Sequence, residues 1–373
     1  MGNELDKPIV NKNPFDGRNE LFRYGINEIQ GWKKTMDIFN IKETNIGPDK
    51  NINIFGLFDG HSGEEISKYL SLHFVNELLN NDNFNNKKYK IALEETFKNL
   101  DLSLRTEEVN NKLIIYSKQS KYEKKNRIND IYKTIDNNNN NALNEDDLNN
   151  ICDFMEMIEP NNLEDVLVSD YVGSSAIVIL ILDKKTYIAK AGNSHCIAIN
   201  KKFCIINDKK VFNPKKYNYN IEKERINISK GIKYGKEKEN IYEKEDFLYT
   251  RGFGDFQYKN NKLIDADEQE IIPEPDIREI ENENIKFLII CNFGFFESGK
   301  LIDDNDDYDN NNENKNIEKN IANYFINKLQ NSQKNISDII SEYYDEFIYK
   351  GNIYKQNINV NNLSCIIIDF YNN

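Results

Sequence analysis

The chain places short, strongly apolar runs between long polar stretches. Six runs have the length and residue types of β-strands: "NINIFGLF" (51–58), "SSAIVILIL" (174–182), "KTYIAKAG" (185–192), "KFCIIN" (202–207), "KFLIICNF" (286–293) and "LSCIIIDFY" (363–371). Several of these runs are apolar at nearly every position, which is typical of strands without a solvent-exposed face. We therefore expect these strands to be covered on both sides.

Three further segments have helical periodicity: 64–79, 89–109 and 319–330. In the first of them Ile66, Leu70 and Phe74 recur at i, i+4 and i+8, and Ser62 with Glu65 has the spacing of a capping box. Strands and helices are grouped along the chain rather than strictly alternating. This grouping favours an α+β fold over a doubly wound parallel sheet.

Between residues 120 and 165 an asparagine-rich stretch separates two helical stripes. The stripes are Ile128, Ile131 and Ile135 before it, and Leu148, Ile151, Cys152 and Met155 after it. Loop positions one, three, five, seven and twelve are Asp136, Asn138, Asn140, Ala142 and Asp147, with Ala142 offering a backbone carbonyl. This spacing resembles an EF-hand loop, whose oxygens at these positions bind Ca²⁺.

Two positions of this loop depart from the EF-hand pattern. Asn141 replaces the glycine of the sharp turn, although asparagine tolerates the left-handed backbone conformation better than most residues. Asp147 replaces the bidentate glutamate and has a shorter reach. We expect an EF-hand-like insertion with weak affinity for Ca²⁺, and a low-complexity insertion is the alternative.

Charge and cysteine usage exclude several classes of protein. The 373 residues carry 49 Lys and Arg against 62 Asp and Glu, a formal charge of −13 that argues against a nucleic-acid binder. The five cysteines are scattered without a CxxC pair, which indicates free thiols. No secretory segment opens the chain, and the longest apolar run is far too short to span a bilayer. We expect a cytoplasmic protein.

The N-terminal sequence "MGNELDKP" adds a membrane hypothesis. Gly2 would be the site of N-myristoylation, but Asp6 stands where the consensus has Ser or Thr. A single acyl chain gives only reversible attachment to a membrane. An ordinary N-terminal tail remains the alternative.

The stretch "FGLFDGHSG" (55–63) ends a strand-like run with Asp59, Gly60 and His61. Eight more blocks accompany it in one order: 23–37, 173–182, 189–200, 220–226, 249–259, 273–280, 287–298 and 361–368. Together they resemble the metal-dependent Ser/Thr protein phosphatase family of the 2C type. The resemblance covers nearly the whole chain apart from the EF-hand-like insertion and the asparagine-rich loops.

The resemblance implies a four-layer fold and a domain layout. The family has two antiparallel sheets packed face to face, with helices on the outside. We accordingly predict a protein phosphatase 2C-like domain over residues 20–373, the insertion at 120–165 within it, and an N-terminal tail at 1–19.

The same resemblance assigns roles to residues of one site. Asp59 matches the aspartate that bridges two Mg²⁺ or Mn²⁺ ions, and Gly60 offers a backbone carbonyl to the second ion. His61 matches the proposed general acid. Asp37 stands where the family has a glutamate ligand, and Lys33 where an arginine grips the substrate phosphate. Asp255 is interpreted as a structural position near the site, without a catalytic role.

Other ligand positions of the family are lost. Phe293 and Asn361 stand where two aspartate ligands of the first metal are expected, and Asn193 replaces the aspartate of a third, weaker metal. A metal pair carries a charge of +4, whereas Asp37 and Asp59 supply only −2. We therefore expect at most one weakly bound Mg²⁺ or Mn²⁺, held by Asp37, Asp59 and Gly60.

These losses favour one of two functions. The first is a pseudophosphatase that is inactive or weakly active and acts by binding a phosphoprotein or a protein partner, with Ca²⁺ responsiveness through the insertion. The second is an active Mg²⁺/Mn²⁺-dependent phosphatase of phosphoserine and phosphothreonine that uses other acidic ligands.

Overall fold

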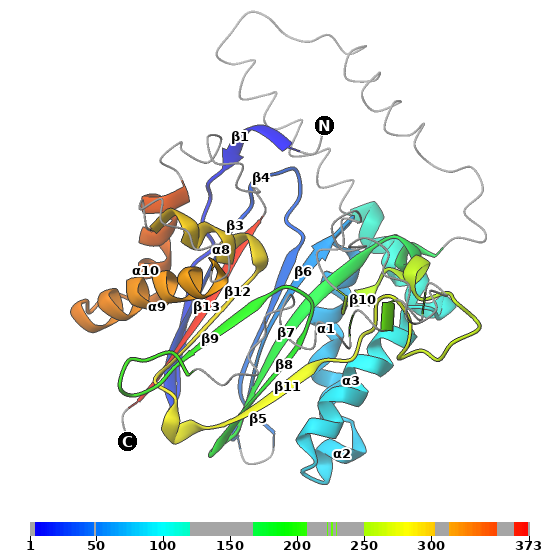
Figure 1. Cartoon of the computed structure of the whole chain (residues 1–373), viewed down its shortest axis with the longest axis horizontal. Coiled ribbons are helices and arrows are strands. Elements are labelled where there is room, and N and C mark those ends of the chain that lie inside the picture. Colours follow the sequence, from blue (N-terminus) through cyan, green and yellow to red (C-terminus); the bar gives the residue numbers. More distant parts are fainter. Residues whose placement is uncertain are drawn as a thin grey trace, which may run out of the picture.

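Two antiparallel β-sheets face each other in the computed structural model (Figure 1). The structure describes residues 4–47, 50–119, 167–206, 222, 225, 226, 229, 250–302, 313–348 and 362–371. Asn361, the loop residues Asp136, Asn138, Asn140, Ala142 and Asp147, and Gly2 lie outside these ranges.

The strands of the described ranges form two large sheets and one small one. The first has the order β11-β8-β7-β6-β5, with β10 paired to β7, and the second has the order β2-β3-β13-β12-β9. The first comprises β5 Ile38–Ile46, β6 Ile52–His61, β7 Gly173–Ile181, β8 Lys185–Ala191, β10 Phe253–Gly254 and β11 Asp276–Glu281. The second comprises β2 Phe15–Arg18, β3 Phe22–Ile29, β9 His195–Ile199, β12 Phe287–Cys291 and β13 Leu363–Phe370. The small sheet pairs β1 Glu4–Ile9 with β4 Gly31–Lys33.

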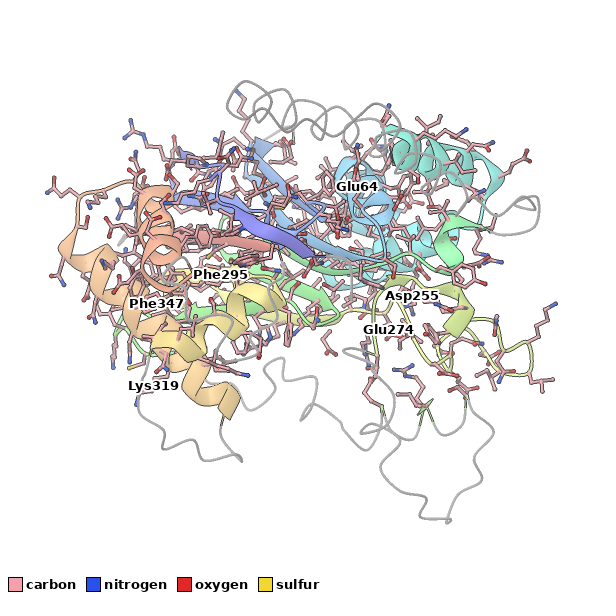
Figure 2. All side chains as sticks on the ribbon, turned by 90° about the horizontal axis from the view of Figure 1, so that it is seen from above. Glu64, Asp255, Glu274, Phe295, Lys319 and Phe347 are labelled. Atoms are coloured by element: carbon pink, nitrogen blue, oxygen red, sulfur yellow. The ribbon has the colours of Figure 1, made fainter. Side chains whose placement is uncertain are left out.

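Helices cover the outer face of each large sheet (Figure 1). The α-helices include α1 Glu65–Leu79, α2 Asp82–Asn85, α3 Tyr89–Ser103, α8 Phe293–Ser298, α9 Glu313–Asn331 and α10 Ile336–Tyr343. Short helical turns are η1 Val168–Asp170, η2 Phe256–Tyr258, η3 Asn282–Asn284, η4 Gly299–Ile302 and the π-helical η5 Tyr344–Ile348. Figure 2 places Phe295 among the helices beside the second sheet, and Glu64 and Asp255 on the side of the first.

Three apolar clusters fill the layers of this sandwich. Along β6, Phe55 and Leu57 pack between the sheets, whereas Ile54 and Phe58 pack against α1 and α3. Side chains of a strand alternate between its faces, so a strand covered on both faces is apolar throughout. The predicted α+β sandwich of two antiparallel sheets with outer helices is thereby confirmed.

Several predicted elements differ in their bounds. The first predicted helix is α1, but Ser62 has a φ of +61° and the cap residue Glu64 makes no side-chain capping bond, so the predicted Ser62–Glu65 capping box is wrong. The second predicted helix ends at Ser103, and a separate helical segment covers 107–119. The turn between them is stabilised by a bond from the backbone N–H of Thr106 to the carbonyl of Ser103.

The run "KFCIIN" is not a strand of the sheet. The strand is β9, to which Ile205 bridges back at Ile199 and the backbone N–H of Ile206 donates at the carbonyl of Ala198. The side chain of Asn200 accepts bonds from the backbone N–H groups of Lys202 and Cys204, which stabilises a tight turn there. Within 1–19, predicted as a tail, residues 4–9 and 15–18 form β1 and β2.

Candidate functional site

The predicted site residues meet where β6 ends and β4 leads into β5. Lys33 ends β4, Asp37 precedes β5, and Asp59, Gly60 and His61 end β6. The Nζ atom of Lys33 lies 3.6 Å from Oδ2 of Asp37, and the backbone N–H of Gly60 donates to the carbonyl of Asp37 at 2.9 Å. The structure thus brings together the five residues for which the sequence predicted retained roles.

Asp37 is held in place through its backbone. Its N–H donates to Oδ1 of Asn362 at 2.9 Å, and its carbonyl also accepts from Oγ of Ser67 at 2.7 Å. The Nδ2 atom of Asn362 donates to the carbonyls of Gln30 and Thr35. The carboxylate is buried, and Oδ1 of Asp37 has no hydrogen-bond partner. A buried carboxylate oxygen of this kind is suited to a cation.

Asp59 extends from the face of β6 that also carries Phe55 and Leu57, toward the second sheet. There Nδ2 of Asn292 donates to Oδ2 of Asp59 at 3.2 Å and to the carbonyl of Asn362 at 2.8 Å. Burial raises the pKa of Asp59, and this effect is only partly opposed by Lys33, Asn292 and His61. The carboxylate is therefore joined to the opposite sheet by an amide.

The orientation of the Asn292 amide is set by its neighbours. Its Oδ1 accepts from the backbone N–H of Phe295 at 3.3 Å and of Ser364 at 3.1 Å, so it caps α8 and links to β13. Both amide atoms are thus engaged, and the residue is fully buried. Because a carbonyl oxygen cannot donate, the N–H side must face Asp59.

Two other positions of lost ligands, Phe293 and Asn193, lie within the described residues. Phe293 begins α8 and is half-buried, whereas Phe295 and Phe296 belong to the core under α9 and α10. Asn193 is buried in the turn between β8 and β9. The ring of His195 stacks on Phe296 at 3.5 Å between ring centroids, and burial holds the pKa of His195 well below its usual value. Phe293 is not part of this core, whereas Phe295 and Phe296 are.

His61 has a close polar partner that the sequence did not identify. Its Nε2 lies 2.6 Å from Oδ2 of Asp255, a residue for which the sequence predicts only a structural position near the site. Asp255 is buried, whereas about a third of the His61 side chain is exposed. No sequence pattern indicates this pair, because the two residues lie 194 positions apart.

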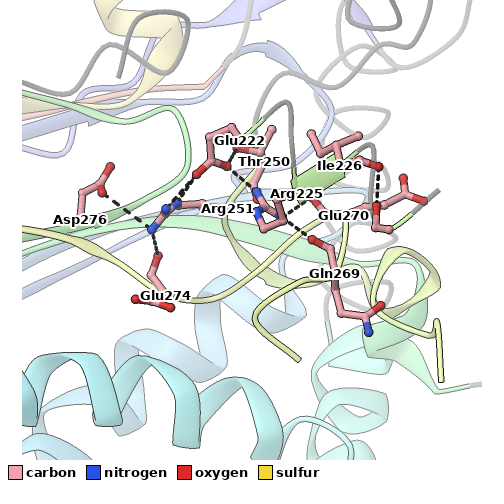
Figure 3. Close-up of polar contacts among 10 residues, drawn as sticks. Glu222, Arg225, Ile226, Thr250, Arg251, Gln269, Glu270, Glu274 and Asp276 are labelled. Atoms are coloured by element: carbon pink, nitrogen blue, oxygen red, sulfur yellow. Dashed lines mark hydrogen bonds and ion pairs between the residues drawn. The ribbon is translucent and has the colours of Figure 1, made fainter. Parts of the chain in front are cut away.

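A buried polar network surrounds Thr250 and Arg251, at the start of the segment 250–259 that carries Asp255 (Figure 3). Glu222 accepts bonds from Arg225, from Oγ1 of Thr250 at 2.6 Å and from Arg251 at 2.8 and 3.1 Å. Arg251 also donates to the carbonyl of Glu274 at 2.9 Å. Burial would raise the pKa of Glu222, but the two guanidinium groups outweigh it and lower the pKa.

The donor set limits what the site can bind. Within the described ranges, no three His, Cys, Asp or Glu side chains come together as ligands for a metal ion. Asp37 and Asp59 are the carboxylates that the site itself contributes, together with the backbone of Gly60.

Among the described helices, none combines the length and apolar composition needed to cross a bilayer.

Comparison with known proteins places the chain among phosphatases. The family model described as "Protein phosphatase 2C" matches residues 22–120 and 110–300. A "Probable protein phosphatase 2C 2" of Paramecium tetraurelia is 28% identical over 302 residues, covering 80% of this chain and 81% of the relative. "Probable protein phosphatase 2C 21" of Arabidopsis thaliana is 27% identical over 81% of this chain and 80% of the relative.

Solved structures share the fold. A phosphatase from a pathogenic strain of Toxoplasma gondii superposes with a TM-score of 0.56 at 13% identity, covering 97% of this chain and 96% of that one. A serine-threonine phosphatase 2C from the same organism gives a TM-score of 0.51 at 13% identity, covering 99% and 98%.

Proposed function

Because the chain belongs to the protein phosphatase 2C family, we propose that it is a pseudophosphatase of that family. In this proposal the protein binds a phosphoprotein or a protein partner at the site of Lys33, Asp37, Asp59 and His61, with little or no hydrolysis. Family membership supports the fold, and the altered ligands limit the chemistry that the proposed site could perform.

The contact between Asn292 and Asp59 is the observation that carries the proposal. An N–H group directed at Oδ2 of Asp59 occupies the side of the carboxylate that faces the second sheet. A cation at that place would meet a donor rather than an acceptor, because Oδ1 of Asn292 is engaged by two backbone N–H groups. The residues present therefore do not fit a metal at the first position of the family pair.

A single cation fits the other side of the site better. The unpartnered Oδ1 of Asp37, the carboxylate of Asp59 and the backbone of Gly60 form an oxygen-only donor set of the kind that Mg²⁺ and Mn²⁺ use. Such an ion would supply charge for binding a phosphate group. The two carboxylates of this donor set, partly offset by the ammonium of Lys33, are too few to neutralise the +4 charge of two divalent ions.

Lys33 and His61 are the groups proposed to contact a phosphorylated ligand. Lys33 ends β4 at the site, and its ammonium binds phosphate as a point charge without the bidentate fork of arginine. We extend the proposal to a Ca²⁺-responsive insertion at 120–165 and to weak membrane attachment through Gly2.

A paired assay tests the proposal. The full chain and Asp59→Ala are assayed with millimolar Mn²⁺ on p-nitrophenyl phosphate and on a phosphoserine peptide. Loss of the metal-activated nucleophile removes several kcal/mol of transition-state stabilisation, about three orders of magnitude in rate, so both proteins should give the same background. Turnover that disappears in Asp59→Ala would instead establish the second hypothesis, an active phosphatase.

Binding is measured on the same proteins by fluorescence anisotropy. A phosphoserine peptide should bind more tightly than its unphosphorylated counterpart, and Lys33→Ala should remove that difference. Equal affinity for both peptides in the unaltered chain would refute phosphoprotein binding at this site.

A further inference from the structure

Two cysteines lie directly opposite each other in the second sheet. Cys291 is the last residue of β12, and its register partner on β13 is Cys365. Both side chains are fully buried, and both carry free thiols in this structure. We propose that these two thiols form a reversible cross-strand disulfide under peroxide, which acts as a redox-sensitive link beside the candidate site. The inference is independent of the proposed function.

The hydrogen-bond pattern of the ladder brings the two cysteines close together. The neighbouring pair, Asn292 and Ser364, is hydrogen-bonded, because the backbone N–H of Asn292 donates to the carbonyl of Ser364 at 3.3 Å. The two kinds of pair alternate along an antiparallel ladder, so Cys291 and Cys365 form a non-hydrogen-bonded pair, whose Cα atoms are about 4.5 Å apart. A disulfide spans about 4.4–6.8 Å between Cα atoms. The two strands are therefore already close enough for the bond.

Both cysteine side chains lie on the same face of the sheet. Residues directly opposite each other in a ladder share a face, and Cys291 and Cys365 both belong to the apolar cluster under α8, α9 and α10. Cys196, on the neighbouring strand β9, belongs instead to the cluster between the two sheets. Cys204 is exposed beyond the end of β9. Among the cysteines of the described ranges, Cys365 is thus the one placed to react with Cys291.

Burial slows the reaction of these thiols. It raises the pKa of both Cys291 and Cys365, and the thiolate is the form that reacts. Tyr343 of α10 is buried close enough to both thiols that each of them affects its pKa. Oxidation therefore requires a local opening of this part of the core, and hydrogen peroxide is a small oxidant that can enter through it.

The step balances with hydrogen peroxide as the oxidant. The thiolate of one cysteine attacks a peroxide oxygen, the O–O bond breaks, and a sulfenic acid and a hydroxide form. The thiolate of the second cysteine attacks the sulfenic sulfur, so that the S–S bond forms and the S–O bond breaks to release a second hydroxide. The two protons lost by the thiols convert both hydroxides to water. The cysteines lose two electrons in total, and the peroxide gains them.

The bond would lie next to the contact that reaches Asp59. Asn292 follows Cys291 in the sequence, and Ser364 precedes Cys365. The Oδ1 atom of Asn292 accepts from the backbone N–H of Ser364 at 3.1 Å, while its Nδ2 donates to Oδ2 of Asp59 at 3.2 Å. A covalent link one position away restricts the separation of β12 and β13 here. The oxidised state therefore holds the amide that faces Asp59 more firmly in place.

Peptide mapping of the full chain tests the pairing. The unaltered protein is incubated with hydrogen peroxide, free thiols are blocked with N-ethylmaleimide in denaturant, and peptides are identified without reduction. Most molecules should yield a peptide pair joined through Cys291 and Cys365, which dithiothreitol separates. If both cysteines remain unlinked in protein whose exposed Cys204 has been oxidised, the proposal is overturned.

Two variants control for the choice of partner. Cys196→Ala removes a buried cysteine from the other face of the sheet, and the link between Cys291 and Cys365 should still form. Cys365→Ala should abolish the link. A bond from Cys291 to Cys196 in the unaltered chain would show that the register partner is not the residue that reacts.

Hydrogen exchange measured by mass spectrometry tests the effect on the site. Peptides that contain Ser364 should exchange about tenfold more slowly in the oxidised protein than in the reduced one, because the link opposes opening of the β12–β13 pair. Peptides from α3, which covers the other sheet, should exchange equally in both states. Unchanged exchange at Ser364 in protein that carries the link would contradict its coupling to the site.

Discussion

Asn292 and Phe293 are adjacent in the sequence, but their side chains lie in different surroundings. The sequence directs attention to Phe293, because it stands where a ligand is expected. In the structure it is Asn292 that contacts Asp59, while Phe293 is half-buried at the start of α8. Whether a cation can bind beside Asp59 therefore depends on which atom of the Asn292 amide faces the Asp59 carboxylate.

Replacing Asn292 by aspartate should make the stability of the fold depend on metal. In a chelator, Asn292→Asp should be less stable than the unaltered chain by about 1–3 kcal/mol, because two carboxylates then meet in a buried place. Millimolar Mn²⁺ should recover the melting temperature of this variant, since an ion that binds the folded state stabilises it. Differential scanning fluorimetry measures both effects.

Asn292→Ala is the matched control for this prediction. It loses the same hydrogen bonds to Asp59 and Asn362 but adds no carboxylate, so Mn²⁺ should leave its melting temperature low. Equal recovery of both variants by Mn²⁺ would show that the ion acts elsewhere.

Lys190 offers a pH-dependent prediction away from this site. Burial lowers its pKa to about 8, opposed by the carboxylates of Asp276 and Glu318. The unfolded chain keeps this proton up to about pH 10.4, so the unfolded state binds more protons between pH 8 and 10 and stability rises there with pH. The charged ammonium of Lys190 therefore destabilises the folded state most strongly below pH 8.

Lys190→Met should raise the free energy of unfolding at pH 7 by up to about 3 kcal/mol, and the gain should shrink strongly by pH 10. Urea unfolding at the two pH values measures the difference. The neighbouring titratable groups remain in both proteins: His195, Cys196, Asp276, Cys291 and Glu318. A gain of the same size at both pH values would mean that packing, and not the charge, is responsible.

At the scale of elements, the segment 250–259 shows how secondary structure and site are joined. It contributes the two-residue strand β10, the left-handed Asp255 and the turn η2, and it reaches α3 through Asp101. Its polar contacts to Asp101, Glu222 and Glu274 reach distant parts of the chain. Sequence patterns relate residues that are close in the chain. They therefore predict that this segment lies near the site, but they do not predict its distant partners Asp101 and Glu222.

The buried pair of Asp101 and Lys259 should be costly to break from one side. Both side chains are about 95% buried, and removing one partner leaves an unpaired charge in the interior. Asp101→Asn should lower the free energy of unfolding by about 3–5 kcal/mol, and adding Lys259→Met should recover part of that loss. Glu108→Gln is the control, because Glu108 pairs with Lys112 on the exposed surface, and it should leave the free energy of unfolding unchanged.

Urea unfolding of these variants checks the prediction. A double variant that is less stable than Asp101→Asn alone would show that the contacts of Lys259 to Gly252 matter more than its charge.

At the scale of the whole molecule, the architecture could be predicted from the sequence more accurately than the individual strands. Continuous apolar runs such as the one in β7 identify strands covered on both faces. β3 escaped the prediction, because it buries Asn27, whose amide donates to the carbonyl of Ser337 and to Oγ of Ser341 on α10. Buried polar side chains with distant partners do not produce an apolar pattern.

The candidate site could be predicted in part for the same reason. The residues proposed to contact a metal or a phosphate lie in motifs at the ends of strands, so Lys33, Asp37, Asp59, Gly60 and His61 could be named as candidates from the sequence. The contacts of Asn292, Asn362 and Asp255 could not be predicted, because these residues form hydrogen bonds to residues 194 or more positions away. Such contacts exist only once both sheets have assembled.

The number of ions bound by the site tests the central proposal most directly. Calorimetric titration of Mn²⁺ into Asp136→Ala, chosen so that the loop at 136–147 does not contribute, should show at most one weakly bound ion per chain, which Asp37→Ala removes. Two tightly bound ions per chain that both vanish when Asp59→Ala is added would contradict the account.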